Sequence, residues 1–445
     1  MGVRHLLHRM AAILALAATL SLWQAPPAAA TAISLIRDAE IEATLRQISA
    51  PIFEAAGLDP GSVRIYIVQD ERLNAFVAGG MNLFLNTGLL MRTEHVGQLV
   101  GVIAHEVGHI AGGHLSRVGT AQKRAAAEMI LATVLGAAAA VAGAPDLGTA
   151  IITGGQSFAF GGLMRFSRSQ EQAADQAALT YLDRAGLSAR GLAEFFKVLE
   201  NQNMLAVSGS PYVQTHPLTR DRITFIESRV AGEGADRIPQ SWHEEHARMV
   251  AKLRGFLDDP RQAAERYQGD TSFPGRYALA IAHYRMPDLE QALREVEALI
   301  AEEPDNPYLH ELKGQMLFEN GRVDAAVAPY LKSVELRPES ALLRIGLARA
   351  LIETGQDGAN SEAIGHLKDA VEREPTNAGA WRLLGIAQGR AGSQGASSLS
   401  LAEYALLTGK REDARMYARR AEAAIEPSDP SWIRLQDILR VIDES

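Results

Sequence analysis

The fold of the first half of the chain is decided by one stretch, His105-Glu106-Val107-Gly108-His109. Around it, apolar residues recur at helical spacing from Val96 to Ile110, which predicts a buried helix. Two histidines four residues apart lie on one face of a helix, so both imidazoles can reach one Zn²⁺. Glu106 lies beside them, where its carboxylate can act on water as a general base. The stretch therefore predicts a metallohydrolase site on a rigid helix.

A second helix is predicted to begin near residue 167, where Ser167 and Gln170 have the spacing of a capping box. This helix carries Glu171 and Asp175 on one face, among small and apolar residues. Such a face is expected to turn inward, and buried carboxylates need cations or hydrogen-bond donors. A zinc ion held by the two histidines and Glu171 would be such a cation. The alternative is a surface helix that exposes both acids to solvent.

A further histidine, His114, lies five residues after His109. One zinc-protease pattern places its third histidine six residues after the second, and here Leu115 occupies that position. On a continuous helix His114 would point about 140° away from His109. We therefore predict a structural role for His114.

Composition limits the chemistry that is possible. The chain has 445 residues, 47% of them apolar, which is typical of two or three globular domains. It contains no cysteine, so thiol catalysis, disulfides and cysteine-bound zinc are excluded. Any zinc must be held by histidines and carboxylates. The net charge of −9 is spread along the chain, which argues against a nucleic-acid partner.

The first thirty residues predict export. A basic start with Arg4 and Arg9 precedes an apolar run from Met10 to Trp23 and the small residues 28–30. This pattern is typical of a signal peptide cleaved near Ala30. The alternative is an uncleaved membrane anchor, although the run is shorter than the ~20 residues that span a bilayer.

Strand patterns lie between the start of the mature chain and the zinc-motif helix. Residues 33–57 have a helical pattern with a kink or break at Pro51, and residues 62–70 alternate as a half-buried strand does. Two further strand-like runs flank a Gly-Gly pair, which predicts a hairpin over residues 74–86.

The hairpin has a functional and a structural interpretation. An exposed strand edge at Asn74, Ala75 and Phe76 can bind substrate as an added strand, because backbone pairing holds any extended sequence. A purely structural hairpin explains the same residues equally well.

An uncharged Ala- and Gly-rich run extends from Met129 to Ala144 and is followed by a second apolar stretch to Ile152. The run is shorter than a membrane span, and alanine is weakly hydrophobic. We predict a packed helical hairpin or a mobile cover over the site. Peripheral membrane contact through residues 129–152 is the alternative.

Four ordered motifs carry a family resemblance. They are HEVGH at 105–109, SRSQEQAAD at 167–175, the NAF…GG…NTGLL stretch at 74–90, and THPLTRDR at 215–222. With them the chain resembles the M48 family of zinc metallopeptidases, in particular exported bacterial members that carry C-terminal tetratricopeptide repeats. The resemblance implies zinc ligation by His105, His109 and Glu171. It also implies Glu106 as general base, Asp175 as a supporting or proton-donating acid, and a gluzincin-like α+β domain with a small sheet.

The last motif contains His216 and Arg222. His216 is predicted in a loop, because the proline that follows it favours extended geometry. It could bind the oxyanion, or occupy the open zinc position and hold the enzyme idle until substrate displaces it. A structural turn histidine is the third possibility. Arg222 could be an oxyanion donor or the partner of a nearby acid.

A 34-residue period appears in the C-terminal half. Pro304 and Pro338 are separated by this distance, as are Gly321 and Gly355, and it is the length of a tetratricopeptide repeat. Stacked helix pairs of this kind bury one continuous core and leave a concave face that typically binds peptides or partner proteins. A capping appendage without a ligand is the alternative.

Together these features predict a mainly α-helical, periplasmic protein with three parts. Residues 1–30 are expected to form a signal peptide, residues 31–262 a zinc metallopeptidase domain, and residues 263–445 an α-solenoid. We expect one Zn²⁺ per chain and endopeptidase activity on extended or unfolded envelope proteins that are misfolded or stalled. An envelope protein is the expected partner of the repeats, and the resemblance implies outer-membrane protein assembly. The alternatives are a chaperone-like adaptor with a latent or structural zinc site and a membrane-embedded processing protease.

Overall fold

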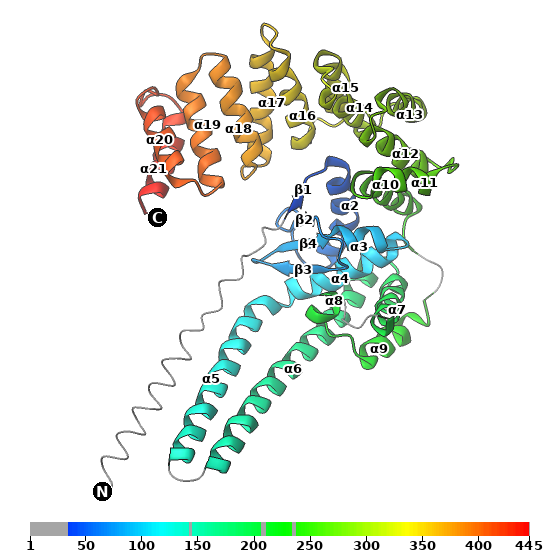
Figure 1. Cartoon of the computed structure of the whole chain (residues 1–445), viewed down its shortest axis with the longest axis vertical. Helices are drawn as coiled ribbons and strands as arrows, with labels where there is room; N and C mark the ends of the chain where they lie inside the picture. The colour runs from blue at the N-terminus through cyan, green and yellow to red at the C-terminus, as the bar shows by residue number, and fades with distance from the viewer. Residues whose placement is uncertain (1–33, 142–144, 206–210, 234–236, 445) are drawn as a thin grey trace. The chain divides into compact units, whose positions relative to one another are not determined.

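The computed structural model describes residues 34–141, 145–205, 211–233 and 237–444 (Figure 1). The predicted signal peptide lies outside these residues. The chain divides into two units, residues 1–35 and 36–445, and the elements from α2 onward belong to the second.

The first helix, α2 (Ala39–Ala55), follows the short strand β1 (Leu35–Ile36). Asp38 caps α2, because its side chain accepts a hydrogen bond from the third backbone N–H that follows it. The helix predicted over residues 33–57 is present but begins only at Ala39, and the alternative of a break at Pro51 is wrong. The helix continues through Pro51, where buried apolar residues on both sides hold it in the core.

A small sheet follows, with the strand order β1-β2-β4-β3. Strand β2 (Arg64–Val68) pairs in parallel with β4 (Asn82–Asn86), and β3 (Ala75–Ala78) pairs antiparallel with β4. The turn between β3 and β4 contains Gly79 and Gly80, both with positive φ, which confirms the predicted hairpin. Strand β3 ends the strand order, so its outer edge has no neighbouring strand in the described sheet.

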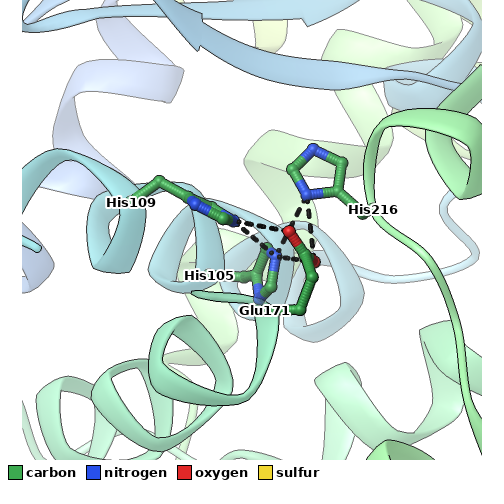
Figure 2. Close-up of side chains that lie close together, drawn as sticks. All are labelled: His105, His109, Glu171 and His216. Atoms are coloured by element: carbon green, nitrogen blue, oxygen red, sulfur yellow. Dashed lines mark hydrogen bonds and ion pairs between the residues drawn. The ribbon is translucent and has the colours of Figure 1, made fainter. Parts of the chain in front are cut away.

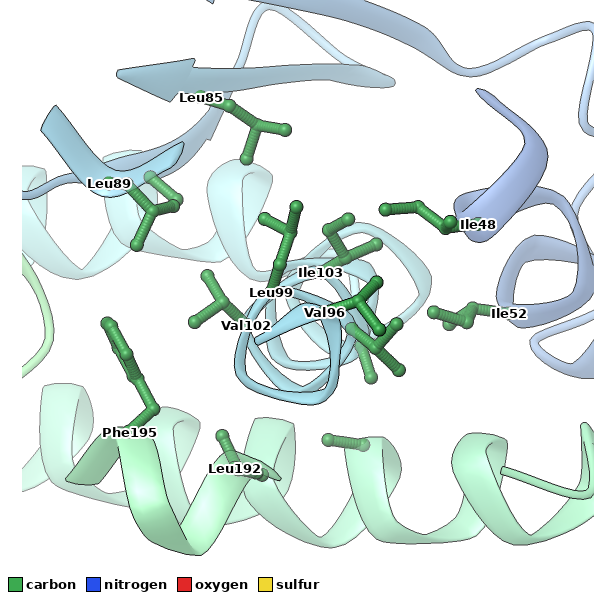
Figure 3. Close-up of a cluster of buried hydrophobic side chains, with 14 of the residues drawn as sticks. Ile48, Ile52, Leu85, Leu89, Val96, Leu99, Val102, Ile103, Leu192 and Phe195 are labelled. Atoms are coloured by element: carbon green, nitrogen blue, oxygen red, sulfur yellow. The ribbon is translucent and has the colours of Figure 1, made fainter. Parts of the chain in front are cut away.

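The zinc-motif helix is α4 (Val96–Ala111), which follows the short helix α3 (Thr87–Arg92). Every residue of α4 from Val96 to His109 is buried. Figure 3 shows α4 end-on, surrounded by side chains from the sheet, from α2 and from α7 (Arg190–Leu205). A helix buried on nearly all sides has a fixed position, which is what a metal site requires.

Helices α5 (His114–Val141) and α6 (Pro145–Arg184) pack along each other, which confirms the predicted helical hairpin. Because α6 already begins at Pro145, Ser167 and Gln170 lie inside a helix, and the predicted capping box is wrong. The described part of α5 exposes a group of apolar side chains: Met129, Ile130, Leu131 and Val134. Among the helices of the described residues, none has the length and apolar content of a membrane span.

Between the helical hairpin and the repeats, α7 is followed by three further helices. They are α8 (Pro211–Thr215), α9 (Arg220–Val230) and α10 (Gln240–Leu257). Helix α11 (Pro260–Tyr267) comes next, and the predicted domain boundary at residue 262 falls inside it.

Helix pairs make up the rest of the chain, as the 34-residue period predicts. They are α12 (Phe273–Arg285), α13 (Leu289–Glu302), α14 (Pro307–Glu319), α15 (Val323–Leu336), α16 (Ala341–Thr354), α17 (Ala359–Arg373), α18 (Ala378–Arg390), α19 (Gln394–Leu407), α20 (Arg411–Glu422) and α21 (Ser431–Glu444). Small residues at equivalent positions, Ala292, Ala326 and Ala363, are fully buried where paired helices pack closely. The fold is therefore mainly helical with one small sheet, in agreement with the predicted class.

Candidate active site

Segments that are far apart in the sequence meet at one buried cluster (Figure 2). Helix α4 supplies His105 and His109, α6 supplies Glu171, and His216 follows α8 directly. One nitrogen or carboxylate oxygen from each of these four side chains lies within 4.8 Å of the others. The structure thus brings the predicted zinc ligands together and adds His216 to them.

Gly108 allows the two main helices of the site to approach each other. A Cβ at this position would lie 2.8 Å from the carbonyl oxygen of Ala174, so α4 and α6 cross where α4 has no room for a side chain. Glu171 lies one turn before this crossing. Its Oε2 is 3.3 Å from His105 Nε2, and its Oε1 is 3.4 Å from His109 Nε2.

The spacing of these atoms fits a tetrahedral zinc ion. Ligand atoms about 2.0–2.1 Å from such an ion are roughly 3.3 Å from one another. The Nε2 atoms of His105 and His109 are 3.1 Å apart, and both are near 3.3 Å from Glu171. Two imidazoles and one carboxylate are also the donor set of catalytic zinc sites. These residues could therefore hold zinc.

Burial and neighbouring charges shift the pKa values of the ligands in different directions. Burial together with the nearby His105 lowers the pKa of His109 to about 2, so His109 is neutral, as a ligand must be. For His105, burial lowers the pKa, but Asp175 and Glu171 outweigh it and raise the pKa to about 9. Burial opposes ionisation of Glu171, yet hydrogen bonds from the histidines keep its pKa below the usual value. The negative charges of Asp175 and Glu171 therefore favour a positive charge at His105.

Glu106 lies beside the cluster and is fully buried. Neither of its carboxylate oxygens has a hydrogen-bond partner in the described part of the chain, although His216 Nε2 lies 3.4 Å from Oε1. Burial raises the pKa of Glu106, which brings it closer to the working range of a general base. A buried carboxylate without a hydrogen-bond partner, beside a candidate metal site, could accept a proton from water.

Further buried contacts surround the candidate ligands. Asp175 Oδ1 lies 2.9 Å from His105 Nδ1, and Arg222 donates to both oxygens of Asp175 at 2.6 and 2.9 Å. Arg222 Nη1 also lies 3.0 Å from Glu171 Oε2. Burial opposes ionisation of Asp175, but Arg222 and His105 keep its pKa below the usual value. Of the two predicted roles for Arg222, this geometry favours the partner of buried acids.

His216 approaches the ligands through Nδ1, which lies 3.3 Å from His105 Nε2 and 3.2 Å from Glu171 Oε2. Its ring stacks on Tyr212 of α8, with the centroids 4.6 Å apart. The sequence interpretation missed Tyr212. The available signal was its place four residues before His216, which is one turn of helix.

His114 does not point away from the site. The prediction assumed one continuous helix, but α4 ends at Ala111 and Gly113 turns the chain with φ of +61°. His114 begins α5, and its Nδ1 lies 2.9 Å from Nδ1 of His109. The prediction that His114 points away from His109 is therefore wrong, because it assumed that α4 continues past Ala111.

A cavity of about 660 Å³ opens onto the cluster. Glu106, His109 and His216 line it, together with Asn74 and Phe76 from the edge of the sheet. Further apolar lining comes from Val77, Met164 and Phe166. Ala75 is buried in the sheet, so its side chain does not face the cavity.

Comparison with known proteins defines the class of this site. Residues 36–230 match the model of Peptidase family M48, and residues 277–341 match a tetratricopeptide repeat model. The first region is an M48 metallopeptidase domain, and repeats follow it. Both matches confirm the resemblance drawn from the four motifs.

Individual relatives narrow the class. The chain is 25% identical over 360 residues to the beta-barrel assembly-enhancing protease of Yersinia pestis. This alignment covers 78% of this chain and 71% of the relative. The chain is 24% identical over 357 residues to the beta-barrel assembly-enhancing protease of Escherichia coli (strain K12), covering 78% and 72%. A shorter match, 27% over 199 residues, is to the mitochondrial metalloendopeptidase OMA1 of Schizosaccharomyces pombe, covering 43% and 55%.

Similar solved structures include YrrB, a TPR protein with an unusual peptide-binding site. The sequence of YrrB is 15% identical to this chain, and the match covers 39% of this chain and 91% of YrrB with a TM-score of 0.33.

Proposed function

We propose that this chain is an exported zinc endopeptidase of the bacterial envelope that hydrolyses misfolded or stalled proteins. The observation that carries the proposal is the cluster of His105, His109 and Glu171 at tetrahedral spacing, with Glu106 buried beside it. The relatives named beta-barrel assembly-enhancing proteases support a role in outer-membrane protein assembly. Export rests on the signal-peptide pattern of residues 1–30, and a periplasmic location follows from it.

In this proposal His105, His109 and Glu171 hold one Zn²⁺ per chain. Zinc, when bound, supplies a Lewis acid that polarises the scissile carbonyl and lowers the pKa of water. Glu106 accepts a proton from water on a carboxylate oxygen as the water oxygen bonds to the carbonyl carbon. Glu106 then gives the proton to the amine as the carbon–nitrogen bond breaks. Asp175 has the supporting role rather than the proton-donating one, because Arg222 and His105 already engage its carboxylate.

We further propose that substrate binds along the outer edge of β3, at Asn74, Ala75 and Phe76. The support is that this edge has no neighbouring strand in the described sheet and that Asn74 and Phe76 line the same cavity as Glu106. Backbone pairing at an edge accepts any extended or unfolded polypeptide. Such a mode suits an enzyme that removes misfolded proteins.

His216 determines whether the site is open. With His216 as a fourth ligand the site would be closed, and closed sites are typical of structural zinc, whereas catalytic sites keep one position open. The position of His216 Nδ1 among the ligand atoms supports the latent arrangement over the oxyanion role. We propose that substrate or a partner displaces His216 before hydrolysis.

The repeats, predicted to span residues 263–445, are proposed to dock substrates or an envelope partner on their concave face. The exposed apolar side chains of α5, such as Ile130 and Leu131, support peripheral membrane contact through residues 129–152. Both proposals concern where the peptidase domain works, and neither changes the chemistry of the site.

The test is cleavage of an unfolded protein by the zinc-loaded mature chain. Glu106→Gln is expected to bind zinc as the parent does but to lose about 10²- to 10⁴-fold in rate, because the general base is gone. Glu54→Gln, an exposed acid on α2, is the matched control and is expected to cleave normally. Equal rates for Glu106→Gln and the parent would remove Glu106 from the mechanism. Absence of cleavage even when His216 is replaced would favour the alternative, a chaperone-like adaptor with a structural zinc site.

A further inference from the structure

His114 contacts the side of His109 that faces away from the other ligands. The two Nδ1 atoms are 2.9 Å apart, and the rings meet edge to face with their centroids 4.9 Å apart. His114 is 5% exposed and His109 is 7% exposed, so little water competes for this contact. A buried hydrogen bond between two imidazoles requires one nitrogen to donate and the other to accept.

The remaining contacts of His109 determine which nitrogen donates. Its Nε2 lies 3.1 Å from His105 Nε2 and 3.4 Å from Glu171 Oε1, so Nε2 is the atom that faces the metal position. A neutral imidazole with a free lone pair on Nε2 carries its proton on Nδ1. The Nδ1–H group of His109 therefore donates to the lone pair on Nδ1 of His114.

The two zinc-motif histidines, His105 and His109, thus have different partners at their Nδ1 atoms. Asp175 meets Nδ1 of His105, and His114 meets Nδ1 of His109. Metal-bound histidines in general donate this N–H to an acceptor that fixes the tautomer and the orientation of the ring. His114 supplies the acceptor for His109 without adding a negative charge.

Two glycines make the contact possible. Gly113, with φ of +61°, turns the chain between α4 and α5, so His114 folds back toward the preceding helix. A Cβ on Gly112 would lie 2.5 Å from Nε2 of His114. The imidazole of His114 therefore occupies the space that any side chain at position 112 would need.

We propose that His114 is a positioning residue that fixes the tautomer and ring orientation of His109 for zinc binding. The proposal rests on the proposed zinc function and adds to it a residue outside the ligand set. Partners of this kind typically change metal affinity by about 10- to 100-fold when they are removed.

The test compares the zinc affinity of the parent, His114→Leu and His114→Asn by competition with a chelator. His114→Leu is expected to bind zinc about 10- to 100-fold more weakly. His114→Asn is expected to recover most of that loss, because the amide oxygen takes the place of Nδ1 as acceptor. Thermal unfolding of the metal-free proteins checks that both variants fold. Parent-like affinity in His114→Leu, or equal losses in both variants, would overturn the proposal; a parent that binds no zinc would contradict the proposed function instead.

A second pair of variants keeps His114 in place. Gly112→Ala is expected to displace the imidazole and to weaken zinc binding, because the added Cβ overlaps Nε2. Gly119→Ala, on α5, adds a Cβ with no atom within 4 Å and is the matched control. If Leu at position 114 prevents folding, this pair decides the question. Equal zinc affinity in Gly112→Ala and Gly119→Ala would then overturn the proposal.

Discussion

Asp175 Oδ1 lies 2.9 Å from Nδ1 of His105, and Arg222 donates two hydrogen bonds to the same carboxylate. Asp175 is fully buried, and Arg222 is 2% exposed. Burying such charges is costly unless they are paired and hydrogen-bonded in good geometry. The pair therefore holds α6 against α9 and, through the contact with His105, positions one of the proposed zinc ligands.

Replacing Asp175 is expected to weaken zinc binding. Asp175→Asn keeps the size of the side chain but removes the charge that orients His105, so zinc affinity should fall about 10- to 100-fold. Asp221→Asn, an exposed acid in the first turn of α9, is the control and should not change it. Titration with a zinc chelator measures both. Parent-like affinity in Asp175→Asn would show that the carboxylate does not support the ligand.

Removing Arg222 is expected to lower the free energy of unfolding. Arg222→Met leaves Asp175 buried without its cation, which should lower the free energy of unfolding by about 3–5 kcal/mol. Arg220→Met, an exposed arginine on the same helix, should change it by less than about 0.5 kcal/mol. Urea unfolding at neutral pH makes the comparison. Equal stability of the two variants would contradict the buried ion pair.

Gly108 is expected to tolerate no side chain. Gly108→Ala would place a Cβ 2.8 Å from the carbonyl oxygen of Ala174, so α4 and α6 must separate. Overpacking of this kind costs about 1–3 kcal/mol of stability. It should also weaken zinc binding, because Glu171 moves with α6. Gly119→Ala serves as the control here too, and a Gly108→Ala protein with parent stability would contradict the close crossing.

His216→Ala is expected to increase the rate at which an unfolded protein is cleaved. Two histidines and one glutamate remain as ligands, so zinc should stay bound while the fourth position becomes open. Initial rates and zinc content, measured on the same preparation, separate the two proposed roles. A variant that keeps zinc but cleaves more slowly would favour His216 as an oxyanion donor.

His246 is expected to make the fold sensitive to acid. Its Nε2 lies 2.8 Å from the hydroxyl oxygen of Thr93, and burial together with nearby His95 and His243 lowers its pKa to about 4. The unfolded state, with an ordinary pKa near 6.5, binds the proton more readily, so stability is full above pH 6.5 and is lost as the pH falls toward 4. His246 alone should remove about 2 kcal/mol between pH 7 and pH 5.

Urea unfolding at the two pH values tests this, with His246→Gln as the comparison. Glutamine can still donate to Thr93 but does not titrate. The variant should lose less stability than the parent on acidification, by about the 2 kcal/mol assigned to His246. Identical losses would show that His246 is not the group responsible.

The repeating and local parts of the fold could be predicted from the sequence. The helix at 96–110, the hairpin around Gly79 and Gly80, and the 34-residue repeats each have a pattern within a short window. The start of α6 could not be predicted. Ser167 and Gln170 have the spacing of a cap, but packing against α5 extends the helix to Pro145, and a local pattern does not contain that contact.

The candidate site, like the fold, could be predicted only in part from the sequence. The zinc motif and the following carboxylates suggested which side chains meet, whereas the choice between two roles for Arg222 needed the position of Asp175 in space. The error on His114 had a different origin. Gly112-Gly113 is a common helix end, and treating it as part of a longer helix gave the wrong direction for the histidine.

We propose that His105, His109 and Glu171 hold one zinc ion while Glu106 stays free to act on water. Elemental analysis of the purified, zinc-replete chain measures the zinc content. We expect one zinc per chain in the parent and in Glu106→Gln, and a large loss of zinc in Glu171→Ala. A parent without zinc, or Glu171→Ala with as much zinc as the parent, would contradict it.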